Sequence, residues 1–229
     1  MKLARFIIDT HVHAQRHAPG PEFKKLGMDD PKKIRYNDLA QIMPTLKTYE
    51  NSKRLLYDME CYGVDMCILH PAFGMSNEIN LELVEKYPDK FVALATPKNT
   101  VDKARTGEIE WSFDTAMEEL DGLLATGKFV GIGEGMPTRP YHVTTEHQNY
   151  SQTERMDDLR KVMELGRKYA VPVRVHTGSP MGYQITYSFW PENFHPNWVR
   201  DLAAEYPDVS IIFDHGCMQG GKWDTLVHE

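Results

Sequence analysis

The feature that most constrains this chain is the recurrence of short apolar runs, each followed by a polar loop and then by a helical pattern. Such runs, rich in β-branched residues, are typical of strands buried on both faces of a parallel sheet. The runs lie at Phe6–Ile8, Met66–Leu69, Phe91–Ala95, Phe129–Ile132, Val171–Val175 and Val209–Phe213. Helical patterns fall between them, at Ser52–Tyr62, Glu78–Tyr87, Phe113–Ala125, Thr153–Tyr169 and Asn197–Tyr206. Strands that alternate with helices predict an α/β fold with right-handed crossovers.

Polar and histidine-rich residues follow the runs directly, at the carboxyl ends of the predicted strands. A (β/α)8 barrel gathers its active site at that face, and doubly wound sheets also bind ligands there. No glycine-rich phosphate fingerprint follows the first run, which disfavours a dinucleotide-binding fold. We therefore expect one TIM-like (β/α) barrel domain over residues 1–229, with about six of the eight βα units present.

Composition excludes some functions. The net charge of -7 argues against a nucleic-acid partner. No apolar run approaches the roughly 20 residues of a membrane span, so no membrane association is expected. The three scattered cysteines do not make a disulfide framework, and a cytoplasmic location is the expectation.

The strongest motif is Asp9-Thr10-His11-Val12-His13, at the end of the first run. Alternate side chains on a strand point the same way, so Asp9, His11 and His13 are expected to face the barrel interior. Two neutral imidazoles at this spacing suit one divalent metal, zinc before manganese or another ion. A hydrogen-bonded pair of structural histidines is the alternative, and the histidines after later strands favour the metal.

Two of those later histidines stand at equivalent places. His176 follows the fifth run in ValArgValHisThrGly, and His215 follows the sixth in IlePheAspHisGly. Either one alone is typical of a core histidine, but as a pair they are expected to line one cavity. His176 is the better third metal ligand, which leaves His215 for proton transfer. Asp214 either orients a histidine or caps the next helix.

Weaker candidates end two other runs. Glu134 follows the fourth run, where a carboxylate binds metal, acts as a base or forms a salt bridge. His70 follows the second run, where a structural or supporting role is favoured over metal binding. The long segment 179–196 is aromatic and is expected either to wall a pocket for a flat or apolar substrate or to contact another subunit.

Three motifs together, IIDTHVH, VRVHTG and IIFDHG, resemble the metal-dependent amidohydrolase superfamily. The resemblance is narrower to the amidohydrolase-related branch that includes aminocarboxymuconate-semialdehyde decarboxylase and γ-resorcylate decarboxylase, and it runs across essentially the whole chain. It implies a barrel with zinc or a related metal, with His11, His13 and His176 as ligands and His215 as the catalytic acid/base. The branch also uses an aspartate after the eighth strand, and Asp224 does not match that position.

The resemblance thus lacks the last two βα units, so the chain is expected to be a fragment, to be completed by a second chain, or to be a shortened relative. Open strand edges favour association, as a homo-oligomer or with that second chain. The first functional hypothesis is non-oxidative decarboxylation of a small aromatic or unsaturated carboxylic acid. The alternatives are metal-dependent hydrolysis of an amide, ester or lactone, and a non-catalytic or incomplete partner subunit.

Overall fold

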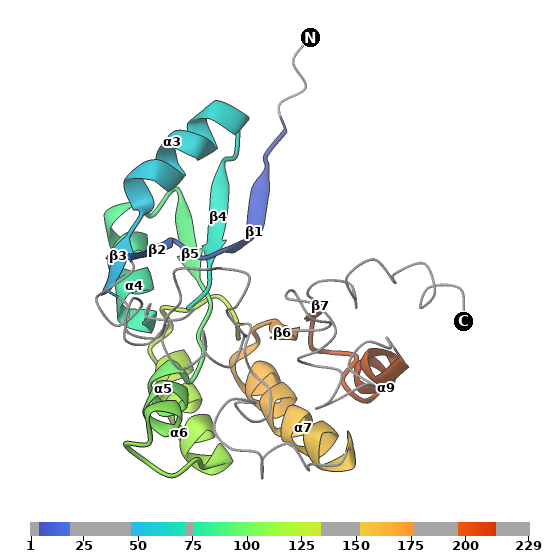
Figure 1. Ribbon diagram of the computed structural model, residues 1–229. Helices are drawn as coiled ribbons and strands as arrows, with labels where there is room; N and C mark the ends of the chain where they lie inside the picture. Colours follow the sequence, from blue (N-terminus) through green and yellow to red (C-terminus); the bar gives the residue numbers. More distant parts are fainter. Residues whose placement is uncertain (1–4, 19–46, 72–75, 134–151, 176–196, 214–229) are drawn as a thin grey trace, which may run out of the picture.

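The computed structural model describes residues 5–18, 47–71, 76–133, 152–175 and 197–213. Within these ranges three strands come first, and helices then alternate with strands except where three helices follow one another between residues 98 and 169 (Figure 1). The strands are β1 (Ile8–Val12), β2 (Gln15–Ala18), β3 (Lys47–Glu50), β4 (Met66–Leu69), β5 (Phe91–Ala93), β6 (Val173–Val175) and β7 (Ile211–Phe213). The helices are α3 (Ser52–Tyr62), α4 (Asn77–Lys86), α5 (Lys98–Thr106), α6 (Phe113–Ala125), α7 (Gln152–Tyr169) and α9 (Asn197–Glu205). None of the described helices is both long and apolar enough to cross a bilayer.

β2 and β3 form a separate antiparallel hairpin, and the other strands form one run of parallel neighbours in chain order. β1 pairs with β4, β4 with β5, and β6 with β7, all in parallel. Single parallel bridges from Ala95 to Ile132 and from Ile132 to Val173 join the two groups. No strand of the described part inserts between earlier ones, so this sheet does not show the reversed order of a doubly wound fold.

The sheet curves strongly. Four neighbour steps separate β1 from β6, which in a flat sheet would be about 19 Å at about 4.8 Å per step. Yet the Arg174 guanidinium on β6 donates a hydrogen bond to the carbonyl oxygen of Thr10 on β1. An arginine side chain is far too short to span the flat distance. The two strands must therefore face each other across a curled sheet.

The two faces of the sheet differ in chemistry. Alternate strand residues pack with the helices into one apolar core, and the opposite face carries the residues between them. The core side chains from the sheet include Cys67, Leu69, Phe91, Ala93, Val173 and Val175, and those from the helices include Met59, Leu83, Leu120, Leu159 and Leu202. By alternation, the concave face receives His70 and Arg174, which are 0% and 4% exposed. A buried imidazole and a buried guanidinium thus lie on the face away from the helices.

Several predicted elements are confirmed. β4, α3 and α6 have the predicted bounds, Gly63 ends α3 in the left-handed conformation, and the Ser112 side chain caps α6. Ser76 caps α4, and the Asn77 side chain binds both backbone polar groups of Thr96. The fourth predicted strand is reduced to the bridge at Ile132, and α5 and the β2–β3 hairpin were not predicted.

Candidate functional site

The candidate site begins at an irregularity in β1. Asp9 pairs with Cys67 and Val12 with Leu69, so three steps along β1 oppose two steps along β4. One extra residue of this kind is a β-bulge, which leaves backbone groups out of the ladder and re-aims side chains. Here the Thr10 carbonyl oxygen accepts bonds from two side chains, the Nε2–H of His70 (3.1 Å) and the guanidinium of Arg174.

The bulge corrects one prediction. Cys67 and Leu69 both point to the helix side, so their partners Asp9 and Val12 share that side. Asp9 therefore does not share the face of His11 and His13. Its carboxylate instead accepts the backbone N–H of His11 (3.1 Å). Burial raises the pKa of the Cys67 thiol to about 11, and the nearby Asp9 carboxylate adds to the rise.

Three imidazoles gather on the concave side of this bulge. The ring centroids of His11 and His13 are 5.2 Å apart with an interplanar angle of 78°. The His70 ring stacks on that of His11 at 4.9 Å and 24°, and lies 5.9 Å from that of His13. The rings of His11 and His13, two residues apart at the end of β1, therefore lie close together as predicted. The ring of His70, which directly follows β4, lies beside them.

The hydrogen bonds of His13 define which ring nitrogen carries a proton. Its Nδ1 lies 3.2 Å from the carbonyl oxygen of His70. A carbonyl only accepts, so Nδ1 is the protonated nitrogen and the lone pair of the neutral ring is on Nε2. A histidine whose other ring N–H is held by a backbone carbonyl is the usual arrangement for a metal ligand.

The pair fits a divalent metal by donor type and spacing. Imidazole nitrogens bind zinc at about 2.0–2.1 Å, which places two ring centroids on one tetrahedral ion about 5 Å apart. His11 and His13 meet this spacing. Among the residues that the structure describes, however, no group of three or more His, Cys, Asp or Glu side chains is arranged to hold a metal. Any third protein ligand would have to lie outside those ranges.

The remaining predicted site residues lie outside the described ranges. His176 directly follows β6 in the chain, and His215 stands two residues after β7. Glu134 and Asp214 likewise fall outside, as does the aromatic segment 179–196. Their roles stay predictions. Because β6 and β7 are parallel neighbours of the same ladder, their carboxyl ends point to the edge where β1 ends.

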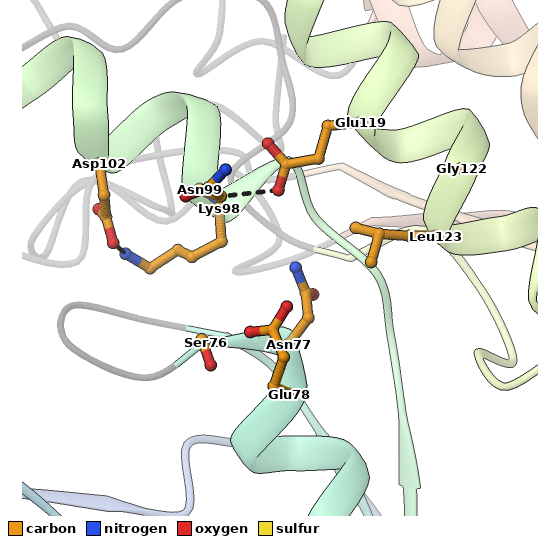
Figure 2. Close-up of a pocket in the computed structure, with 9 residues that line it drawn as sticks. All are labelled: Ser76, Asn77, Glu78, Lys98, Asn99, Asp102, Glu119, Gly122 and Leu123. Carbon is orange, nitrogen blue, oxygen red and sulfur yellow. Dashed lines mark hydrogen bonds and ion pairs between the residues drawn. The ribbon is translucent and has the colours of Figure 1, made fainter. Parts of the chain in front are cut away.

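A separate cavity of about 570 Å³ lies at the N-termini of α4 and α5 and is walled by α6 (Figure 2). Several of its polar groups take part in hydrogen bonds or ion pairs. The Glu119 carboxylate accepts the backbone N–H groups of Asn99 (3.0 Å) and Thr100 (2.7 Å), and thereby caps α5. The Lys98 ammonium turns along α5 to pair with Asp102. These groups stabilise helix ends, which gives the cavity a structural explanation.

Sequence reasoning missed Arg174. It precedes the predicted ligand His176 by two residues and so shares its face of the strand, yet a lone charged residue within an apolar run gives no sign of its partner. Its burial at 4% exposure and its bond to Thr10 are visible only in the folded chain. An arginine between two buried valines was the available signal, since charged groups are rarely buried without a partner.

Comparison with solved structures gives a partial likeness. No family model and no curated protein matches the sequence. A probable 2-pyrone-4,6-dicarboxylic acid hydrolase from Acinetobacter baumannii, solved with citric acid bound, is similar at a TM-score of 0.42 and 16% identity. The alignment covers 92% of this chain and 58% of that one, so the chain spans little more than half the length of that structure.

Proposed function

We propose that this chain carries the metal-binding part of an enzyme that acts on a small carboxylic acid, within a (β/α) barrel. The observation that carries the proposal is the His11–His13 pair, with His13 Nδ1–H held by the carbonyl of His70 and its Nε2 lone pair thereby directed to a ligand role. Parallel strand segments in unbroken chain order, curled until β6 meets β1, support the barrel.

In this proposal His11, His13 and His176 hold the metal. A divalent ion bound there would supply positive charge that stabilises negative charge developing on the substrate. Arg174 adds a fixed cation in the same concave face, where it is only 4% exposed. A site with this charge favours an anionic substrate, although the whole chain has a net charge of -7.

The reaction we propose is non-oxidative decarboxylation. The bond from the substrate carbon to its carboxylate breaks, CO2 leaves, and the electron pair on that carbon takes a proton. His215 is the proposed proton donor, because imidazole exchanges protons near neutral pH. The motif resemblance supports this chemistry. Hydrolysis of a lactone, ester or amide of a similar acid is the alternative that the same residues support.

The metal is tested first. The purified protein is depleted with a chelator and titrated with Zn²⁺, Mn²⁺ and Co²⁺, with bound metal counted by elemental analysis. We expect one equivalent to bind the parent protein and the Arg200→Gln control, and binding to be lost in His11→Ala and His13→Ala. Arg200 lies on α9 with a side chain 72% exposed, so its change tests preparation effects only. Equal uptake by the His11→Ala and His13→Ala variants would refute the proposed site.

The reaction is tested with a panel of aromatic and unsaturated acids labelled with ¹³C at the carboxyl carbon, together with lactones, esters and amides of such acids, run in ¹⁸O-labelled water. Release of labelled CO2 supports decarboxylation, whereas ¹⁸O uptake into the product without CO2 assigns hydrolysis. The His215→Ala variant should lose roughly 10²–10⁴-fold in turnover, the usual contribution of a general acid. Full turnover by that variant would remove His215 from the mechanism.

A further inference from the structure

His70 makes an unusual set of contacts with the histidine motif. Its backbone N–H donates to the carbonyl of Val12 (2.9 Å), and its own carbonyl accepts from His13 Nδ1 (3.2 Å). Its side-chain Nε2–H donates to the Thr10 carbonyl (3.1 Å). Its ring stacks on that of His11 at 4.9 Å. One residue thus contacts every residue from Thr10 to His13.

The bond to Thr10 fixes how the His70 ring is engaged. The Thr10 oxygen can only accept, so the His70 Nε2 carries the proton and is committed to the bulge, while the lone pair of the ring lies on Nδ1. The ring also lies nearly parallel to that of His11, at 24°, so the two present faces to each other. Through Nε2 and its backbone, His70 therefore holds the histidine motif in place.

We propose that His70 is the positioning residue of the metal pair, an inference that rests on the proposed function. The side chain anchors the bulge by its bond to Thr10, and this anchor keeps the strand ends in register. That register brings the His70 carbonyl to His13 Nδ1, which holds His13 in the tautomer with its lone pair on Nε2. Arg174 binds the same Thr10 oxygen from β6, so the anchor ties β1, β4 and β6 together.

The buried position explains why the anchor is effective. His70 is fully buried, at 0% exposure, so its bond to Thr10 does not compete with bulk water. A bulge has backbone groups outside the ladder, and without His70 the Thr10 carbonyl would be held by Arg174 alone. Removing the donor therefore relaxes Thr10 and, with it, the positions of His11 and His13.

The test uses substitutions that separate the donor from the ring. In His70→Gln the amide nitrogen takes the place of Nε2 and still donates to Thr10. In His70→Leu and His70→Asn no side-chain donor reaches the Thr10 carbonyl. The Asn variant keeps a polar side chain at this position. Outer partners of metal ligands typically change metal affinity 10–100-fold. We expect His70→Leu and His70→Asn to weaken Co²⁺ and Zn²⁺ binding by roughly that factor, and His70→Gln to stay within about threefold of the parent.

A second readout needs no metal. Long-range ¹H–¹⁵N spectra report which nitrogen of each imidazole is protonated. In the metal-free parent and His70→Gln, His13 should carry its proton on Nδ1, and in His70→Leu and His70→Asn this preference should be lost. If His70→Leu does not fold, as judged by circular dichroism, the Gln and Asn variants make the comparison.

The outcomes separate the two proposals. A parent protein that takes up no metal refutes the proposed function, and the His13 tautomer then decides the positioning role by itself. A parent that binds metal while His70→Leu and His70→Asn bind it equally well, with the His13 tautomer unchanged, overturns the positioning role and leaves the metal site standing.

Discussion

Helix α7 lies directly against the sheet at Gly166, and this contact makes a testable prediction. Gly166 is buried in the last turn of α7. A Cβ added there would lie 2.6 Å from Cγ2 of Val173, 3.2 Å from the carbonyl oxygen of Val171 and 3.2 Å from Cγ1 of Val209. Replacing a helical glycine by alanine normally stabilises a helix by about 0.8–1 kcal/mol. The question is whether packing reverses that sign.

Packing should win. Carbon atoms in contact normally sit about 3.5–4.0 Å apart, so the 2.6 Å approach requires a displacement of roughly 1 Å. Val173 is β-branched with a stiff side chain, and the other two neighbours block the remaining directions. Overpacking of this kind costs about 1–3 kcal/mol. After subtraction of the helical gain, Gly166→Ala should lower the free energy of unfolding by up to about 2 kcal/mol.

The matched control is Gly122→Ala in α6. That glycine is also helical, but a Cβ there would meet no atom within 4 Å, so only the helical gain of about 0.5–1 kcal/mol applies. For a chain of this size, 1 kcal/mol moves Tm by about 2–4 °C. Thermal and urea unfolding should therefore show Gly166→Ala below the parent and Gly122→Ala above it. Two substitutions with the same sign would show that α7 does not press on β6 as described.

Two further predictions concern a thiol and a carboxylate. Cys67 is 1% exposed and its pKa is raised to about 11, so in a Cys217→Ser background a thiol reagent at pH 8 should label the exposed Cys61 at least about 100-fold faster; comparable rates would contradict the burial. Hydrogen bonds from Lys168 and then Tyr169 lower the pKa of Asp121 below its ordinary 3.8, so its contribution to stability is present above that value and disappears as pH falls below it. Asp121→Asn should unfold at a lower temperature than the parent at pH 7 and at the same temperature near pH 2; a difference that persists in acid would remove the ion pair as its cause.

Where the local sequence pattern and the tertiary packing agree, the sequence was sufficient to predict an element and its bounds. β4 and α6 were predicted with their bounds because apolar period, cap and terminator coincide. The prediction of a fourth strand failed at the glycines Gly131 and Gly133, which flank Ile132. Both lie so close to Leu94 that a Cβ would not fit without a shift. Helix α5 was not predicted because its sequence is mostly polar. Its first turn is capped by Glu119 from α6, and no local pattern reveals that partner.

The candidate site likewise has features that local sequence predicts and features that it does not. The convergence of His11 and His13 follows from their spacing on a strand and was predicted. The bulge was not, because nothing in Asp9-Thr10-His11 indicates that β4 is one residue shorter between the paired positions. The bond from Arg174 to Thr10 joins residues 164 positions apart and depends on the curl of the whole sheet. Such a contact is decided by topology rather than by local sequence.

The close approach at Gly166 and the bulge at Thr10 are connected through β6. Gly166 lies against Val173, and the next residue, Arg174, binds the Thr10 carbonyl that His70 also binds. A shift of β6 of roughly 1 Å is large compared with the tolerance of a hydrogen bond, whose donor–acceptor distance is normally about 2.7–3.2 Å. Gly166→Ala should therefore weaken Co²⁺ binding as well as stability, whereas Gly122→Ala should leave Co²⁺ binding unchanged. If Gly166→Ala destabilised the fold but bound Co²⁺ like the parent, the position of β6 would not control the histidine motif, and His70 would have to hold the bulge without Arg174.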